Sequence, residues 1–181
     1  MNKKLLASEV LSVLSFGVLA DTPTYDYVEA GYSSVDFEGL PALTGFEIKG
    51  SHSLSDNFYV AGDHTNVSKN GFDLRLTTIG LGYNMDVTSN SSFFTELDYA
   101  SIDADGAGNE NGYEITTGIR SMLTEKLELK AAVEYLEIDN DDTTSFVFGA
   151  AYKIDDSFAV YADYKLESDL NRIGLGVRFS F

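Results

Sequence analysis

The chain has 181 residues and a formal net charge of −17, which suits one domain and leaves no basic patch for a nucleic acid. It contains no cysteine, so disulfides, cysteine-ligated metals and cysteine nucleophiles are excluded. With 11 Tyr, 12 Phe and 16 Gly but only 2 Pro, the composition favours β-structure with close backbone approaches. We expect no cofactor.

Residues 1–20 have the pattern of a secretory signal peptide. Two lysines at the head precede an apolar segment that ends in small residues, although Glu9 weakens it. The segment is too short, and wrongly flanked, for a transmembrane anchor. We predict cleavage after Ala20, which leaves 21–181 as a single barrel domain; a retained N-terminal helix is the alternative.

The segments that follow alternate large apolar side chains with small or polar ones, which is the period of a β-strand. In 127–135, for example, Leu, Leu, Ala, Val and Tyr alternate with Glu, Lys, Ala and Glu. The ten predicted strands are 25–36, 43–54, 57–66, 72–84, 92–103, 111–123, 126–138, 143–154, 157–167 and 170–181.

The connections between these strands form two alternating sets. The first set consists of the tight turns 55–57, 124–126 and 155–157 and the longer 84–92. The second set consists of 37–42, 67–71, 103–111, 139–142 and 167–170. With both chain ends on one side, the two sets lie at opposite ends of an up-and-down antiparallel meander.

One strand breaks the alternation. Leu74 and Leu76 have a parity that Ile79 and Leu81 do not share. Because an extra residue in one strand reverses the parity of the residues beyond it, we predict a β-bulge near 77–78.

Two features indicate that the apolar face points outward, toward lipid. The strands are longer than the about 5–6 residues usual in globular proteins and match the about 9–11 of a tilted membrane strand. The polar face is also rich in small residues that suit a concave interior. These residues are Gly31, Gly80, Gly82, Gly118, Ala132, Gly149, Ala151, Gly174 and Gly176. We therefore predict an all-β, up-and-down antiparallel transmembrane β-barrel; a secreted lipocalin-like binding barrel is the alternative.

Aromatic residues cluster toward both ends of the predicted apolar face, as amphipathic rings do at the two surfaces of a membrane. Near the tight turns lie Tyr83, Phe93, Tyr152, Phe158, Phe179 and Phe181. Near the opposite end lie Tyr32, Tyr99, Tyr113, Tyr135 and Tyr164.

The final segment, "IGLGVRFSF", alternates up to a terminal phenylalanine. Together with the leader and the amphipathic strands, it resembles the small outer-membrane β-barrel proteins of Gram-negative bacteria, a class that includes OmpX and the transmembrane part of OmpA. The resemblance implies an outer-membrane location and a last strand that the outer-membrane assembly machinery reads. That assembly signal is Ile173, Leu175, Val177, Phe179 and Phe181. Many members have eight strands, so eight is the alternative count.

The parity of the strands places nine acids and seven bases in the lumen. The acids are Glu29, Glu47, Asp63, Glu96, Asp98, Glu114, Glu128, Glu134 and Asp163. The bases are Lys49, Arg120, Lys130, Lys153, Lys165, Arg172 and Arg178. We favour a network of neutralising charges that fills the lumen; the alternative is a narrow, weakly cation-preferring pore for ions or small solutes.

The loops give little evidence of chemistry. His52 and His64 lie on different segments, and the short loops leave no place to build a catalytic site. Asp103, Asp105 and Glu110 form only a weak metal candidate, since the full calcium-loop spacing is absent. We therefore expect a non-enzymatic barrel with a structural or surface-interaction role. Its expected partners are outer-membrane lipid, lipopolysaccharide and the assembly machinery, and we expect a monomer.

Overall fold

The computed structural model describes residues 21–37, 41–106, 108–139, 141–168 and 170–181. The predicted signal peptide and its cleavage site therefore lie outside the described residues. The strands are β1 (Tyr27–Phe37), β2 (Leu43–Ser53), β3 (Phe58–Lys69), β4 (Phe72–Thr88), β5 (Ser91–Ala104), β6 (Gly108–Met122), β7 (Leu127–Ile138), β8 (Asp141–Lys153), β9 (Phe158–Leu166) and β10 (Leu170–Ser180).

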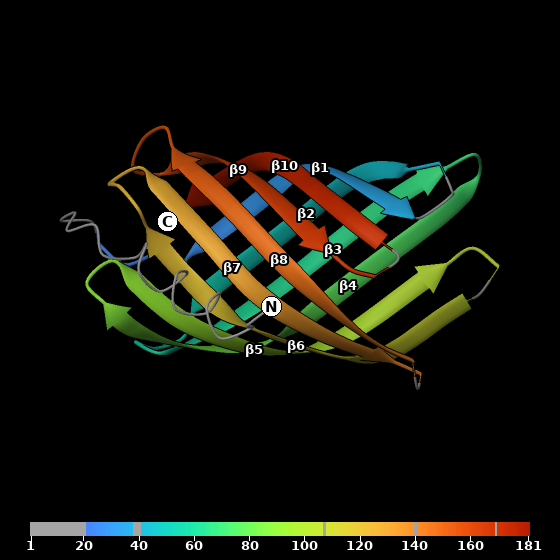
Figure 1. Ribbon diagram of the computed structural model, residues 1–181, viewed down its shortest axis with the longest axis horizontal. Helices are drawn as coiled ribbons and strands as arrows, with labels where there is room; N and C mark the ends of the chain where they lie inside the picture. Colours follow the sequence, from blue (N-terminus) through green and yellow to red (C-terminus); the bar gives the residue numbers. More distant parts are fainter. Residues whose placement is uncertain (1–20, 38–40, 107, 140, 169) are drawn as a thin grey trace, which may run out of the picture.

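Each strand pairs with its neighbour in the chain, and β1 pairs with β10 to close the barrel (Figure 1). All pairs are antiparallel, and the ladder between β1 and β10 runs from Tyr27 opposite Ser180 to Phe37 opposite Leu170. Closure leaves no strand edge unpaired, as lipid requires. The prediction of a ten-stranded up-and-down barrel is confirmed, and the alternative count of eight is wrong.

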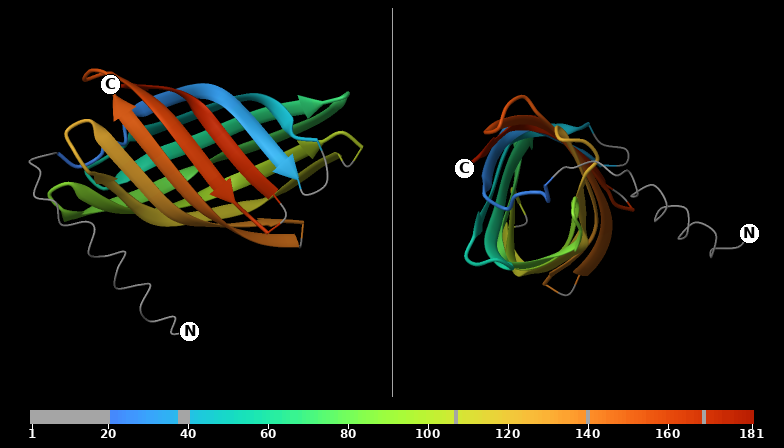
Figure 2. Two further views of the ribbon diagram at one scale, coloured as in Figure 1. Left: turned by 45° about the horizontal axis from the view of Figure 1, so that its top comes forward. Right: turned by 90° about the vertical axis from the view of Figure 1, so that its left-hand side faces the viewer.

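The barrel has two different ends. We call the end with the β2–β3, β4–β5, β6–β7 and β8–β9 connections and the two chain ends the turn end. The other is the loop end. The end-on view in Figure 2 looks at the turn end and shows the strands as a closed ring.

Several hairpins are longer than the sequence predicts. Residues 84–92 and 103–111 were expected as loops, but β4 continues to Thr88, β5 begins at Ser91 and β6 begins at Gly108. The alternation of apolar and polar residues stops in these polar stretches, so the sequence predicts loops. The hydrogen bonds between the two strand backbones nevertheless continue. The β3–β4 hairpin closes through Asn70 and Gly71, which have φ of 54° and 83°, the left-handed values of a two-residue hairpin turn.

The predicted β-bulge at 77–78 is wrong. The β3–β4 register runs without a shift from Lys69 opposite Phe72 to Phe58 opposite Tyr83. Leu74 and Leu76 therefore face the lumen, while Ile79 and Leu81 face outward. The lumen is apolar at the loop end, where Leu74 packs against a buried cluster, so these leucines need no shift of register.

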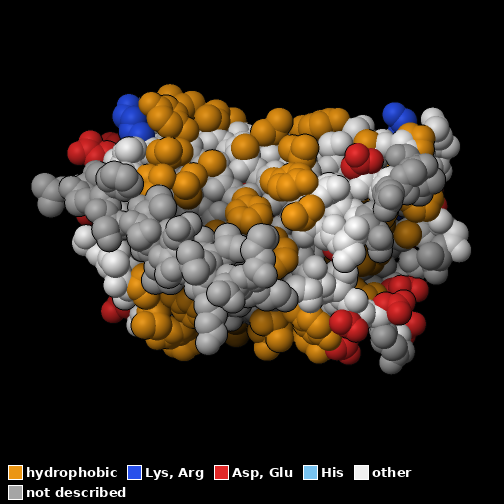
Figure 3. Space-filling model, viewed as in Figure 1, with side chains coloured by type: hydrophobic (Ala, Val, Ile, Leu, Met, Phe, Trp, Pro, Cys, Tyr) orange, Lys and Arg blue, Asp and Glu red, His pale blue; other side chains and the backbone are white. Residues whose placement is uncertain are grey.

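The outer surface of the barrel carries a broad apolar band (Figure 3). Leu81 and Leu97 are each 60% exposed, although they lie in the middle of paired strands. An apolar surface of this extent marks contact with lipid or protein in place of water. The polar lumen and apolar exterior also make the lipocalin-like alternative wrong, since that fold requires the reverse. No helix in the described residues is long and apolar enough to cross a membrane.

Tyrosines of the loop-end belt point their hydroxyl groups toward polar partners. Tyr113 Oη donates to Glu137 over 2.6 Å, and Tyr164 Oη donates to Asn171 over 2.9 Å. A ring in the apolar band with its hydroxyl on a polar group fits the boundary between lipid and water. Glu137 and Asn171 therefore mark the limit of the apolar band at the loop end.

At two of the glycines on the inner face, the structure shows why a larger residue would not fit. The ring of Tyr59 lies directly on Gly82, and the carboxylate of Glu47 lies against Gly174, where in each case a Cβ would collide. Small residues on the inner wall thus make room for large side chains that reach across the lumen.

Candidate functional site

The candidate site is the lumen, where the structure places the charged residues that the sequence predicts there. A central cavity of about 90 Å³ lies between the two ends. It is lined by ten of these residues: Lys49, Asp63, Glu96, Asp98, Glu114, Lys130, Glu134, Asp163, Lys165 and Arg172. At about 30 Å³ of liquid volume per water, this space suits a few water molecules.

A compact ion cluster lies between this cavity and the turn end. Arg178 donates to Glu29 over 2.7 Å and to Glu128 over 2.9 Å, and Arg120 donates to Glu128 over 2.8 Å. Arg178 is on β10 and Glu128 on β7, so the first arginine bridges strands that are not neighbours. Buried charges of this kind persist only when they are paired and hydrogen-bonded.

A second group of contacts spans the lumen at the height of the central cavity. Lys49 on β2 contacts Asp163 on β9 over 2.5 Å and also Glu47 over 3.0 Å. Tyr161 Oη donates to Glu47 over 2.8 Å, and Lys165 pairs with Glu134. These contacts link strands that are not neighbours, β2 with β9 and β7 with β9.

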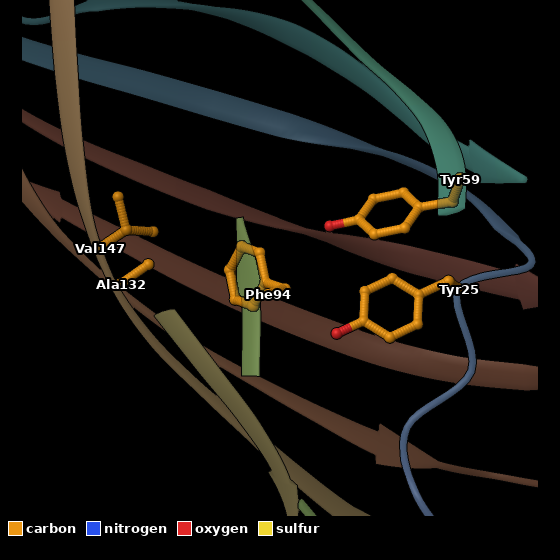
Figure 4. Packing of buried hydrophobic residues seen from close by; sticks show 5 residues of the cluster. All are labelled: Tyr25, Tyr59, Phe94, Ala132 and Val147. Atoms are coloured by element: carbon orange, nitrogen blue, oxygen red, sulfur yellow. The ribbon is translucent and has the colours of Figure 1, made fainter. Parts of the chain in front are cut away.

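A buried hydrophobic cluster, which we call the aromatic plug, consists of Tyr25, Tyr59, Phe94, Ala132 and Val147 and reaches from the turn end toward the middle of the lumen (Figure 4). The rings of Tyr25 and Tyr59 lie side by side with centroids 4.5 Å apart. Tyr25 Oη hydrogen-bonds to Ser92 Oγ over 2.9 Å, and Tyr59 Oη donates to Glu96 over 2.8 Å.

Tyr25 precedes β1, so the plug includes the segment that leads into the barrel. The Arg120 guanidinium lies 4.6 Å from the centre of the Tyr25 ring, and the Arg178 guanidinium lies 4.5 Å from that of Tyr27. These cation–π contacts connect the plug to the ion cluster. Aromatic and ionic contacts are therefore continuous from Tyr25 to Arg178 on the turn-end side of the lumen.

The plug is the feature that the sequence analysis missed. Tyr25 was assigned to the start of a strand, whereas β1 begins at Tyr27 and Tyr25 is only 6% exposed inside the barrel. Tyr25 and Tyr27 have the same parity as the inward-facing Glu29. This shared parity was the sequence signal that Tyr25 points into the lumen. What the pattern does not show is that residues 21–26 turn across the mouth.

Four carboxylates that line the central cavity have no ion pair among the described residues; Asp63 and Glu96 each accept a hydrogen bond from a hydroxyl group, of Thr65 and Tyr59. Within the described ranges, Asp98 and Glu114 have no Lys, Arg or His nitrogen within 4.0 Å. Glu114 accepts one weak hydrogen bond, of 3.5 Å, from Thr116. The cavity lining therefore combines carboxyl groups outside ion pairs with two bases, Lys130 and Arg172, that are also outside ion pairs among the described residues.

The remaining predicted positions do not converge on a reactive site. His52 pairs with Asp26 and His64 with Thr77, on different parts of the outer surface. Asp103 pairs with Arg75, and Asp105 accepts from the Asp73 backbone. In the part of the chain that is described, no group of three His, Asp or Glu side chains could hold a metal ion.

The segment that carries Tyr25 is anchored by Asp26, which lies outside the strands. Burial raises the pKa of Asp26, but hydrogen bonds from the Ser53 backbone and from His52 outweigh it and hold that pKa below 3.8. A lowered pKa means that the anchor is complete at neutral pH and is lost as the pH falls through the folded-state value.

We therefore expect acidification below pH 3.8 to shift the NMR signals of the Tyr25 ring as the anchor weakens. Asp26→Asn cannot ionise, so its Tyr25 signals should not follow this titration. The measurement is a pH series of both proteins in lipid nanodiscs. Identical titrations of the two proteins would show that Asp26 does not anchor the segment.

The sequence matches no protein-family model and no curated protein. The fold, however, is similar to solved outer-membrane barrels. The KdgM porin aligns with a TM-score of 0.50 and 15% identity over 85% of this chain and 99% of that one. The NanC porin aligns at 0.49 with 13% identity, over 86% of this chain and 100% of that one. OprG of Pseudomonas aeruginosa aligns at 0.47 with 11% identity, over 91% and 99%.

At identities this low, only the fold is shared. Closure by ten antiparallel strands, an apolar band on the outside and a polar interior are the properties of membrane-spanning barrels. The protein has the fold of a small outer-membrane β-barrel.

Proposed function

We propose that this protein is a non-enzymatic barrel of the bacterial outer membrane with a closed lumen and a structural or surface-interaction role. The observation that supports the proposal is the packing of Tyr25 and Tyr59 inside the turn end, next to the Arg178–Glu128 bridge. A pore requires a continuous water path, and these buried side chains occupy space in the lumen.

Strand number supports the same conclusion. Barrels of about 8 strands have interiors just wide enough for side chains, whereas open aqueous channels need about 16–18. With ten strands, this barrel is closer in size to the barrels whose interiors are filled by side chains. Its ion pairs also stabilise the filled state, because moving one partner would leave the other as an unpaired buried charge.

The second candidate is a narrow, weakly cation-preferring pore. The carboxyl groups of Asp98 and Glu114 favour it, since they line the central cavity outside any ion pair among the described residues. The nine predicted acids against seven bases give the same sign. This function requires the aromatic plug to move, so the two candidates differ in what the plug does.

Location and partners follow from the surface. The outward-facing residues of β10, including Phe179 at 44% and Val177 at 55% exposure, fit both lipid contact and the proposed assembly signal. The short acidic loop end is suited to solvent, and to cations shared with lipopolysaccharide phosphates. We propose a monomer, because closure uses every strand edge within the chain.

Planar-bilayer recording of the refolded protein tests the proposal. We expect wild type to show only small, infrequent openings. The double variant Tyr25→Ala, Tyr59→Ala should conduct more, because two rings leave the mouth. Tyr32→Ala with Tyr99→Ala is the control, since both rings face outward and are more than half exposed. A large, steady wild-type conductance would instead establish the pore.

A further inference from the structure

The loop end of the lumen contains a second cavity, of about 130 Å³, which we call the apolar cup. Its walls come from strands all around the barrel, so it lies within the lumen and not on the lipid face. Its apolar lining residues are Val35, Val67, Leu74, Leu76, Ile102, Leu136 and Leu170. Val35 and Val67 belong to one buried cluster and Leu136 to another, so these wall residues are held in place by contacts with other apolar side chains.

An apolar cup is unusual inside a barrel whose interior is otherwise charged. Leu74 and Leu76, which interrupt the alternation of apolar and polar residues in β4, line this cup. They occupy lumen positions of the uninterrupted register, at a level where neighbouring strands also present apolar residues to the lumen, such as Val67 and Ile102. The alternation is therefore broken at the place where the cavity lies.

Two bases lie at the floor of the cup. Arg172 and Lys165 line both this cavity and the central cavity below it, so they separate the two. Lys165 is engaged by Glu134. Arg172, in contrast, has no carboxylate within 4.0 Å among the described residues, and its one hydrogen bond is to the neutral Thr65 Oγ1 over 3.3 Å.

Arg172 thus has guanidinium donors to spare. A guanidinium has five N–H donors in a planar fork that matches a carboxylate. Glu167 also lines the cup, but its two oxygens accept hydrogen bonds from Thr143 over 3.1 Å and Ser145 over 3.0 Å. The charge of Glu167 would direct an anionic group away from itself and toward Arg172.

We propose that the apolar cup binds a small organic carboxylate with one ring or a short alkyl chain. The apolar body would lie against Leu74, Ile102 and Leu136, and the carboxylate would take a bidentate hydrogen bond from Arg172. The size agrees, since an apolar cavity of about 150 Å³ takes up benzene. Binding does not require conduction, so it is independent of whether the barrel is closed.

Benzoate is the probe, because it combines one ring with one carboxylate. We expect a saturable shift of the backbone amide signals of Val35, Leu74 and Ile102 when benzoate is titrated into the protein in nanodiscs. Benzyl alcohol keeps the ring without the charge, and acetate keeps the charge without the ring. Both should bind at least about tenfold more weakly, and about 1.4 kcal/mol is tenfold. Benzyl alcohol loses a hydrogen bond between charged groups, worth about 1.5–3 kcal/mol, and acetate loses the burial of the ring, worth about 1.5–3 kcal/mol for a Phe side chain.

Two variants separate the contributions. Arg172→Gln should weaken benzoate binding at least about tenfold while leaving benzyl alcohol unchanged. Leu74→Trp fills the cup and should weaken both ligands. Lys153→Gln is the matched control, since Lys153 faces the lumen at the turn end, near Arg178 and Glu128, and its loss should change nothing.

Amide spectra of each variant first establish that the barrel has folded. If Arg172→Gln fails this test, Arg172→Lys replaces it and should still weaken benzoate, because an ammonium has no planar fork. The proposal is overturned if benzoate does not shift the cup residues, if the Arg172 variant binds benzoate like wild type, or if benzyl alcohol or acetate binds as tightly as benzoate.

Discussion

Replacement of Arg178 by Ala should cost about 3–5 kcal/mol of the free energy of unfolding, the loss typical of breaking a buried ion pair. Arg178 contacts both Glu29 and Glu128, whose side chains are only 4% and 6% exposed. Without the guanidinium, Glu128 keeps Arg120, but Glu29 retains only Lys49 at 4.0 Å. The measurement is urea unfolding of the barrel in lipid bilayers.

Arg75→Ala is the matched control for this experiment. Arg75 also pairs with a carboxylate, but its side chain and that of Asp103 are 45% and 44% exposed. Exposed pairs are worth about 0–1 kcal/mol, so this variant should be close to wild type. Adding Glu29→Gln to Arg178→Ala should restore part of the loss, because it removes the unpaired charge. Equal stabilities of the two single variants would contradict the ion cluster.

We also expect a large loss of stability when arginine is introduced on the face of the barrel that contacts lipid. Val133 faces outward on β7 between Thr117 and Phe146, in the middle of the apolar band. Val133→Arg should therefore cost about 2–4 kcal/mol, the value for arginine at the bilayer midplane. Refolding into bilayers, followed by urea titration, measures the cost.

Asp142→Arg provides the comparison within the next strand. Asp142 has the outward parity of Phe146 but lies opposite Glu137, at the loop end of the barrel. Arginine near the interface costs about 0–1 kcal/mol, so this variant should refold like wild type. Asp141→Ala, also at the loop end, should be nearly silent. Equal costs at 133 and 142 would show that the apolar band does not face lipid.

The sequence by itself determined the strands and the direction in which their side chains point. Alternation with a period of two is a local property, so each segment carries its own assignment of faces. The predicted strand 126–138 became β7, Leu127–Ile138, and the outward residues from Ile173 to Phe179 lie on β10 as the last strand of the barrel. Hairpin ends were less accurate, because polar side chains do not stop a backbone ladder.

Only the tertiary structure decided which lumen residues meet. Arg178 reaches Glu128 across two intervening strands, a contact fixed by the stagger of the closed barrel and absent from any local pattern. The same holds for Tyr25, whose parity points inward but whose place in the plug depends on Tyr59 and Phe94 from distant segments. Leu74 and Leu76 needed the surrounding lumen as well, since only their apolar neighbours show that no bulge is required. Parity is encoded residue by residue, whereas packing across a lumen depends on the shear of the whole sheet.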